Sequence, residues 1–283
     1  MEDSIQEQDY IEVEFRNGRL GYYQNTNNLT LQPDDLIIVE VERGEDIAQI
    51  IHLAIHPSQI PSLPDKTFEI KRIATEADIN KIETLEMDED KASGIFMDIL
   101  ARYPFVMKLI ETVYQFDGNK LTFFFSADGR IDFRVFVREL ANVFRTRIEL
   151  HQTTGRDEAK RLGGFGMCGN PYCCGSFLKR FSQVTIKMAK DQNLAGNLSK
   201  ISGPCGRLLC CLNFEEDFYV EEARDYPLLG TCVMCNTQQM YVFKIDVLNK
   251  RIHLTDEDQV LTEVTLKEFN QLVVIETPQP EPC

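Results

Sequence analysis

Two copies of the pattern Cys-Gly, three residues, Cys-Cys constrain the fold of this 283-residue chain more than any other feature. The first copy spans Cys168–Cys174 and the second spans Cys205–Cys211, so equivalent positions lie 37 residues apart. Phe177 follows the first copy at the same distance as Phe214 follows the second. The repeat predicts two matched thiol-bearing loops that form two clusters or one composite cluster. Such soft ligands suit zinc or iron–sulfur better than calcium or magnesium.

The candidate ligands are the six thiols of these two copies: Cys168, Cys173, Cys174, Cys205, Cys210 and Cys211. Vicinal cysteines do not easily ligate one tetrahedral ion together, so each copy is expected to supply its first cysteine and one of its vicinal pair. The residues alone leave three roles open, namely a zinc or iron–sulfur site, buried reduced thiols, and a thiol–disulfide switch. Four residues are expected to bring backbone amides or positive charge near the sulfurs: Gly169, Gly206, Arg207 and Lys179.

The charge of the cysteine-rich segment is opposite to that of the rest of the chain. Residues 155–211 hold nine Lys or Arg and three acids, a formal charge of +6, although the whole chain carries −15. The acidic total argues against a general nucleic-acid binder. The basic segment, which includes Lys187 and Lys190, suits an RNA phosphate, an acidic partner or the anionic thiolates that it carries. Solvated lysines on a helix are the simpler explanation for part of this charge.

Cysteine usage and the absence of catalytic motifs narrow the class of protein. The chain has nine cysteines, an odd number, and four of them form two vicinal pairs. It starts with acidic residues and has no apolar stretch there. These features predict a cytoplasmic protein with reduced thiols. No apolar run approaches the roughly 18 residues that span a bilayer, so no membrane insertion is expected. The four histidines are scattered and no P-loop, HExxH or paired-carboxylate motif is present, which argues against a hydrolase or a nuclease.

The hydrophobic pattern predicts an α+β fold. Tyr10–Phe15 alternates, and Asn17-Gly18 is typical of a two-residue hairpin. Thr75 and Asp78 suit the start of a long helix, which Gly94 is expected to divide into two. The segments expected are a β module with a Pro-bearing linker (1–66), a central domain (67–225) that carries the cysteine loops (163–218), a small β-barrel-like segment (226–274), and a disordered tail (275–283).

The central domain is expected to contain an antiparallel sheet with helices on one side. Its strands fall at 106–116, 120–125 and 147–150, and a helix is expected at 132–144. Phe123–Phe125 suits a buried strand better than a platform for stacking bases. In the C-terminal segment, Cys232 and Cys235 form half of a zinc-knuckle pattern in a β context. They are expected to be structural or incidental, because no second half is evident.

Several motifs in order resemble the PSP1 C-terminal domain family, in the full-length bacterial form known as the RicT (YaaT) family. They are Phe116–Leu121, Phe123–Phe125, Arg130–Arg134, Phe144–Leu150, Arg156–Lys160, Gly163–Gly169, Ile186–Leu194 and Lys200–Leu212. The match covers most of the chain and is highly specific. Asn170 and Leu198 depart from the residues usual in the family, but every thiol of the two loops is retained.

This resemblance implies a non-enzymatic cytoplasmic subunit. Proteins of this family associate with two small helical partners, RicA and RicF, in a complex that carries [4Fe–4S] clusters. The complex acts as a specificity factor for RNase Y in mRNA processing, and in spore formers it promotes the phosphorelay that leads to sporulation. The resemblance therefore implies a [4Fe–4S] cluster whose ligands are among the six loop cysteines, RicA-like and RicF-like subunits, and RNase Y as a partner. The alternatives that remain are a zinc-stabilised RNA-binding protein and a thiol redox sensor.

Overall fold

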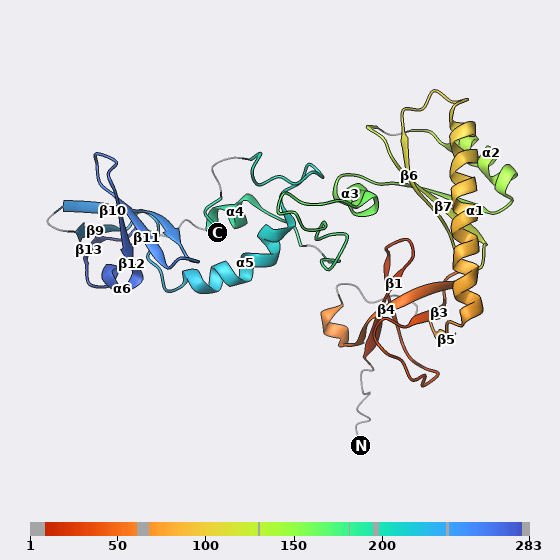
Figure 1. Cartoon of the computed structure of the whole chain (residues 1–283), viewed down its shortest axis with the longest axis horizontal. Helices are drawn as coiled ribbons and strands as arrows, with labels where there is room; N and C mark the ends of the chain where they lie inside the picture. Colours follow the sequence, from red (N-terminus) through yellow and green to blue (C-terminus); the bar gives the residue numbers. More distant parts are fainter. Residues whose placement is uncertain are drawn as a thin grey trace, which may run out of the picture. The chain divides into compact units, whose positions relative to one another are not determined.

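A computed structural model of the protein describes residues 9–60, 68–129, 131–180, 182–194, 198–235 and 238–278. The chain divides into two compact units, Met1–Thr154 and Gly155–Cys283 (Figure 1). The expected α+β class is confirmed, since both units contain sheets and helices. The division falls inside the range 67–225, so the cysteine loops belong to the second unit. Most of the expected linker and tail, at 61–67 and 279–283, lies outside the described residues.

The first unit begins with a five-stranded antiparallel sheet in the order β2-β1-β4-β3-β5. Its strands are β1 (Tyr10–Phe15), β2 (Leu20–Tyr23), β3 (Leu36–Glu40), β4 (Glu45–Ile55) and β5 (Ile70–Ile73), and a 3₁₀ turn, η1 (Pro57–Gln59), follows β4. The predicted hairpin is confirmed, because β1 pairs with β2 across Asn17-Gly18. Side chains such as Val13, Ile37 and Ile50 are fully buried on one face and form the core of this sheet.

The central sheet has the order β6-β7-β8 and is mixed rather than wholly antiparallel. Its strands are β6 (Lys108–Tyr114), β7 (Lys120–Ser126) and β8 (Arg147–Gln152). β6 and β7 pair antiparallel, but β8 pairs parallel to β7. The reason lies in helix α2 (Arg134–Phe144), which carries the chain back so that β8 starts at the same edge as β7. Phe123 and Phe125 are buried in β7, as expected for a core strand.

Helix α1 (Glu76–Leu100) runs without interruption past Gly94, contrary to the expected break. The predicted start is confirmed, because Thr75 and Asp78 form a capping box. Toward its other end the helix packs on the central sheet through Phe96, whose ring centroid lies 4.5 Å from that of Phe123. Gly94 is tolerated because a single glycine weakens a helix without breaking it.

The two sheets of the first unit are joined where the β3–β4 turn meets the turn between β6 and β7. The amide of Glu45 donates to Asp117 Oδ2 at 3.0 Å, and Gln115 Nε2 donates to the carbonyl of Arg43 at 2.8 Å. Gly44 has φ +93°, and a Cβ there would lie 1.8 Å from Asp117 Oδ2. Only glycine allows this approach.

The second unit consists of the cysteine loops with three helices, followed by a five-stranded sheet. The helices are α3 (Arg156–Leu162), α4 (Ile186–Asp191) and α5 (Cys210–Ala223). The sheet has the order β12-β11-β10-β9-β13 and comprises β9 (Cys232–Cys235), β10 (Gln238–Asp246), β11 (Arg251–Thr255), β12 (Leu261–Thr265) and β13 (Val273–Glu276), with helix α6 (Leu266–Phe269) after β12. Cys232 and Cys235 are both buried in this sheet. None of the described helices is long and apolar enough to cross a bilayer.

We expect Gly44→Ala to destabilise the first unit by about 2 kcal/mol or more. Two effects lower the free energy of unfolding. Alanine is unfavourable at a positive φ, and its Cβ would also clash with Asp117. Urea unfolding followed by circular dichroism measures the change.

Two further glycine substitutions separate these causes. Gly118 also has a positive φ but has open space at its Cβ position, so Gly118→Ala should cost only about 1 kcal/mol. Gly94 lies in α1 with open space around it, and Gly94→Ala should stabilise by up to about 1 kcal/mol. If Gly44→Ala and Gly118→Ala lowered the free energy of unfolding equally, the expected clash between a Cβ at position 44 and Asp117 would be contradicted.

Candidate metal centre

The two cysteine loops have the same backbone hydrogen bonds, displaced by 37 positions. The amide of Gly166 donates to the carbonyl of Asn170 at 2.8 Å, and the amide of Gly203 donates to the carbonyl of Arg207 at 2.8 Å. Four more bonds follow the same correspondence: Gly169 to Gly166 (2.9 Å), Gly206 to Gly203 (3.0 Å), Tyr172 to Gly164 (3.0 Å) and Leu209 to Ile201 (2.9 Å). The sequence repeat is therefore also a repeat of structure.

Glycines at equivalent positions allow these turns. Gly169 has φ +80° and Gly206 has φ +72°, a region that other residues occupy at a cost. Their amides close the turns by donating to the carbonyls of Gly166 and Gly203. A Cβ at Gly166 would lie 3.3 Å from the sulfur of Cys168, which shows how closely the backbone passes that thiol.

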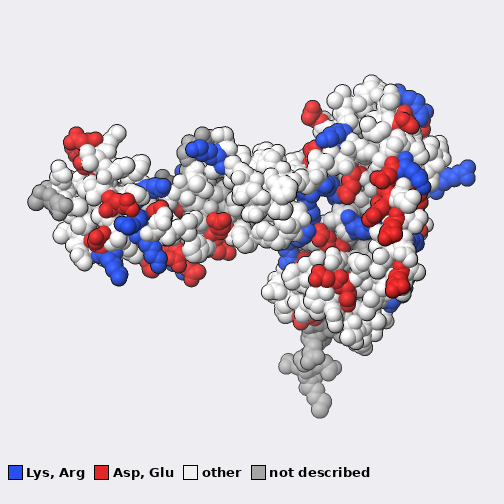
Figure 2. All heavy atoms as spheres, viewed as in Figure 1, with Lys and Arg blue, Asp and Glu red and all other residues white. Residues whose placement is uncertain are grey.

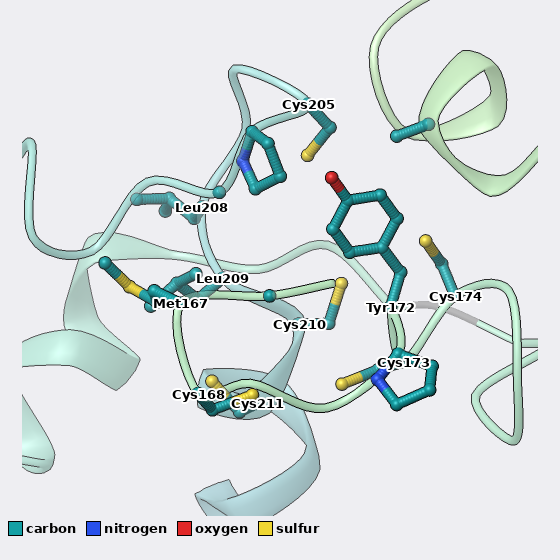
Figure 3. Close-up of a pocket in the computed structure, with 15 residues that line it drawn as sticks. Met167, Cys168, Tyr172, Cys173, Cys174, Cys205, Leu208, Leu209, Cys210 and Cys211 are labelled. Atoms are coloured by element: carbon teal, nitrogen blue, oxygen red, sulfur yellow. The ribbon is translucent and has the colours of Figure 1, made fainter. Parts of the chain in front are cut away.

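All six loop cysteines line one cavity with a volume of about 100 Å³. Figure 3 shows Cys173, Cys174, Cys205 and Cys210 arranged around the ring of Tyr172, with Cys168 and Cys211 at the lower edge. The remaining lining is largely apolar and includes Met167, Leu208 and Leu209. The structure therefore brings the two loops to a single composite site rather than to two separate ones.

Burial holds several of these thiols in their protonated form. It raises the pKa of Cys210 to about 11, and it also raises the pKa of Cys174 and of Cys211. Cys174 is 5% exposed, whereas Cys168 is exposed. A metal must displace protons from the buried thiols, so its binding is favoured as the pH rises.

Two features of positive charge favour the thiolate form instead, namely the start of α5 and the guanidinium of Arg156. Cys210 and Cys211 are the first residues of α5, where unsatisfied amides and the helix dipole favour negative charge on sulfur. The guanidinium of Arg156 lowers the pKa of Cys174 and Cys210, although less than burial raises it. Arg156 Nη2 donates to the carbonyl of Leu208 at 3.0 Å, which fixes the guanidinium beside the second loop.

The loops are supported by packing between equivalent positions. Phe177 and Phe214, which lie 37 residues apart, meet edge to face with their ring centroids 5.1 Å apart. Beneath the second loop, Ile201 and Leu212 are buried together with Ala189 of α4. This small core fixes the start of α5 and therefore the position of Cys210.

The four basic residues expected at the site do not line the cavity. Lys179 Nζ lies 3.5 Å from the carbonyl of Gly175, and the side chain of Arg207 extends toward Gly155. Lys187 and Lys190 are exposed on α4. On the face shown in Figure 2, the surface over the cysteine loops carries few charged side chains.

Two residues near the thiols were not singled out by the sequence, namely Arg156 and Tyr172. Tyr172 stands at the position of the repeat that Leu209 occupies in the second loop, so the alignment of the two copies marks it as a lining residue. Arg156 precedes the first loop by 12 residues, and only the fold brings it close to the sulfurs.

The donor set fits a soft metal or an iron–sulfur cluster, because six thiols surround one apolar cavity. In the described part of the chain, no three His, Cys, Asp or Glu side chains are already arranged as a metal site.

In the metal-free, reduced protein, we expect iodoacetamide to label Cys168 first and Cys174 and Cys210 last at neutral pH. Cys168 is exposed, whereas burial keeps the other two protonated. The labelling rate of Cys210 should continue to rise as the pH approaches about 11, because its raised pKa delays ionisation. Peptide mapping by mass spectrometry follows each thiol, and a urea-unfolded sample gives the reference rates. Equal rates for the three thiols in the folded protein would contradict the structure.

Comparisons with known proteins match both units of the chain. Residues 68–153 match the PSP1 C-terminal conserved region, and residues 183–226 match the third domain of PSP1-like proteins. The chain is 38% identical to Stage 0 sporulation protein YaaT of Bacillus subtilis over 265 residues, which cover 92% of this chain and 94% of that protein. It is 29% identical to the Schizosaccharomyces pombe protein named "Uncharacterized protein PB7E8.02", over 50% of this chain and 23% of that one.

No solved structure matches this chain significantly. The similarity to YaaT extends over nearly the full length of both proteins, and the two PSP1 matches fall in different units of the chain. The chain therefore belongs to the PSP1 family, as a member of its YaaT group.

Proposed function

We propose that this protein is a non-catalytic regulatory subunit that binds a [4Fe–4S] cluster in its cysteine loops. Together with RicA-like and RicF-like helical subunits, it acts as a specificity factor for RNase Y in mRNA processing. The observation that carries the cluster proposal is that all six loop thiols line one cavity. Membership of the YaaT group supports the regulatory role, since the Bacillus relative is named as a stage 0 sporulation protein.

The surroundings of the thiols favour an anionic cluster. An apolar lining lowers the polarity around the sulfurs, and the first turn of α5 with Arg156 offsets negative charge. Cys168 with Cys173 or Cys174, and Cys205 with Cys210 or Cys211, would supply four ligands. When bound, the cluster supplies a redox-sensitive centre, and the chain itself supplies position, charge and exclusion of water.

The two loop thiols that do not ligate the cluster would support it, or they would complete a second site shared with a partner. The surface over the loops in Figure 2 carries few charged side chains, which suits contact with the apolar face of a helical subunit. Several aromatic and aliphatic side chains close to the loops are exposed, among them Phe165, Met167 and Phe177. Such a contact buries apolar area and shields the cluster from oxygen and water.

Anaerobic purification of the full chain, with iron, zinc and acid-labile sulfide assayed beside the absorption spectrum, tests the cluster. We expect about four irons and four sulfides per chain and a broad band near roughly 400 nm. Cys205→Ser should remove most of the iron, because its thiol lines the cavity and belongs to every ligand set given above. Cys235→Ala, a buried thiol of the C-terminal sheet, is the matched control and should keep the iron.

Other results would replace the proposal. Stoichiometric zinc without sulfide indicates a zinc-stabilised RNA-binding protein, whose affinity for RNA falls with salt. A disulfide between the loops under mild oxidant, in a chain without metal, indicates a thiol redox sensor. If the lone chain holds no metal but gains iron when it is co-expressed with RicA-like and RicF-like subunits, the ligands are shared.

A further inference from the structure

A groove with a volume of about 880 Å³ lies in the first unit, far in sequence from the cysteine loops. It is bounded by turns of the N-terminal sheet and by the first residues of two central strands. Four cationic side chains line it: Arg19 between β1 and β2, Arg43 between β3 and β4, Lys120 at the start of β7, and Arg147 at the start of β8. Four separate segments thus bring positive charge to one concave surface.

The charge of the groove contrasts with that of its unit. Residues 1–154 contain 28 Asp or Glu and 16 Lys or Arg, yet the groove has four cations and only two carboxylates, Glu42 and Glu149. Glu149 is shared between two of the cations, with Lys120 Nζ at 3.5 Å and Arg147 Nη2 at 3.3 Å. A local surplus of positive charge in an acidic unit attracts anions.

The groove also has an apolar part and a fixed rim. Tyr23, Val41 and Phe68 contribute apolar surface to its lining. Two hydrogen bonds hold the turn that carries Arg43 in place. Gln115 Nε2 donates to the carbonyl of Arg43, and the amide of Glu45 donates to Asp117 Oδ2. The rim is therefore organised before a ligand arrives, which reduces the entropic cost of binding.

We propose that this groove binds a nucleoside triphosphate. Its phosphates would contact Arg43, Lys120 and Arg147, whose donors suit phosphate oxygens, and its base would lie on the apolar surface near Phe68. The volume falls within the roughly 300 to 1,000 Å³ typical of small-ligand sites. This site is independent of the thiol chemistry of the second unit.

Isothermal titration of the full-length protein with ATP tests the proposal. We expect saturable binding that weakens as salt is raised and that weakens about tenfold in Arg43→Ala, since one charge-assisted contact to phosphate is lost. Arg138→Ala is the matched control, because it removes the same charge from an exposed position on α2 and should leave binding unchanged. Urea unfolding of both variants confirms that each remains folded.

Comparison of ligands tests the two parts of the groove. ATP should bind more tightly than inorganic tripolyphosphate, which lacks a base, and much more tightly than adenosine, which lacks phosphates. Absence of ATP binding, or an equal loss in Arg43→Ala and Arg138→Ala, would overturn the proposal. Equal binding of ATP and tripolyphosphate would overturn the base contact. Binding of oligouridylate without binding of ATP would assign the groove to RNA instead.

Discussion

Main-chain hydrogen bonds hold the two cysteine loops in shape, and the position of every candidate ligand depends on them. Because the amides of Gly166 and Gly203 donate to carbonyls four residues further on, each loop is closed by its own main chain. The main chain thus sets the shape of each loop, and the shape of each loop sets where its three thiols lie.

Two opposing electrostatic effects meet at these thiols. Desolvation favours the neutral form and prevails in the structure, as the raised pKa of Cys210 shows. The start of α5 and the guanidinium of Arg156 favour the anion, but they exert their full effect only on sulfur that has lost its proton. Burial thus protects the reduced thiols from attack by oxidants, while the same surroundings contain groups that stabilise thiolates bound to a metal.

The sequence predicts features that depend on neighbours along the chain, and it misses those that depend on the fold. The hairpin at Asn17-Gly18, the cap at Thr75 and the matched loops all have short-range signals, and the structure contains them. The direction of β8 depends on the path through α2, so strand periodicity alone does not reveal it. Lys187 has the right charge, but it is exposed on α4 and does not line the thiol cavity. The groove is invisible in the sequence because its cations are spread from Arg19 to Arg147.

The structure separates the lysines of α4 from the thiol cavity, although both lie in one segment of the sequence. Residues 155–211 carry both the thiols and a formal charge of +6, which suits an RNA phosphate, an acidic partner or the thiolates themselves. In the structure, Lys187 and Lys190 are exposed on α4, whereas the cavity is lined by thiols and apolar groups. Coulombic effects of exposed lysines are weakened by water and salt, so they contribute little to the charge balance of the buried sulfurs. Arg156, by contrast, lies close enough to favour the thiolate form of Cys174 and of Cys210.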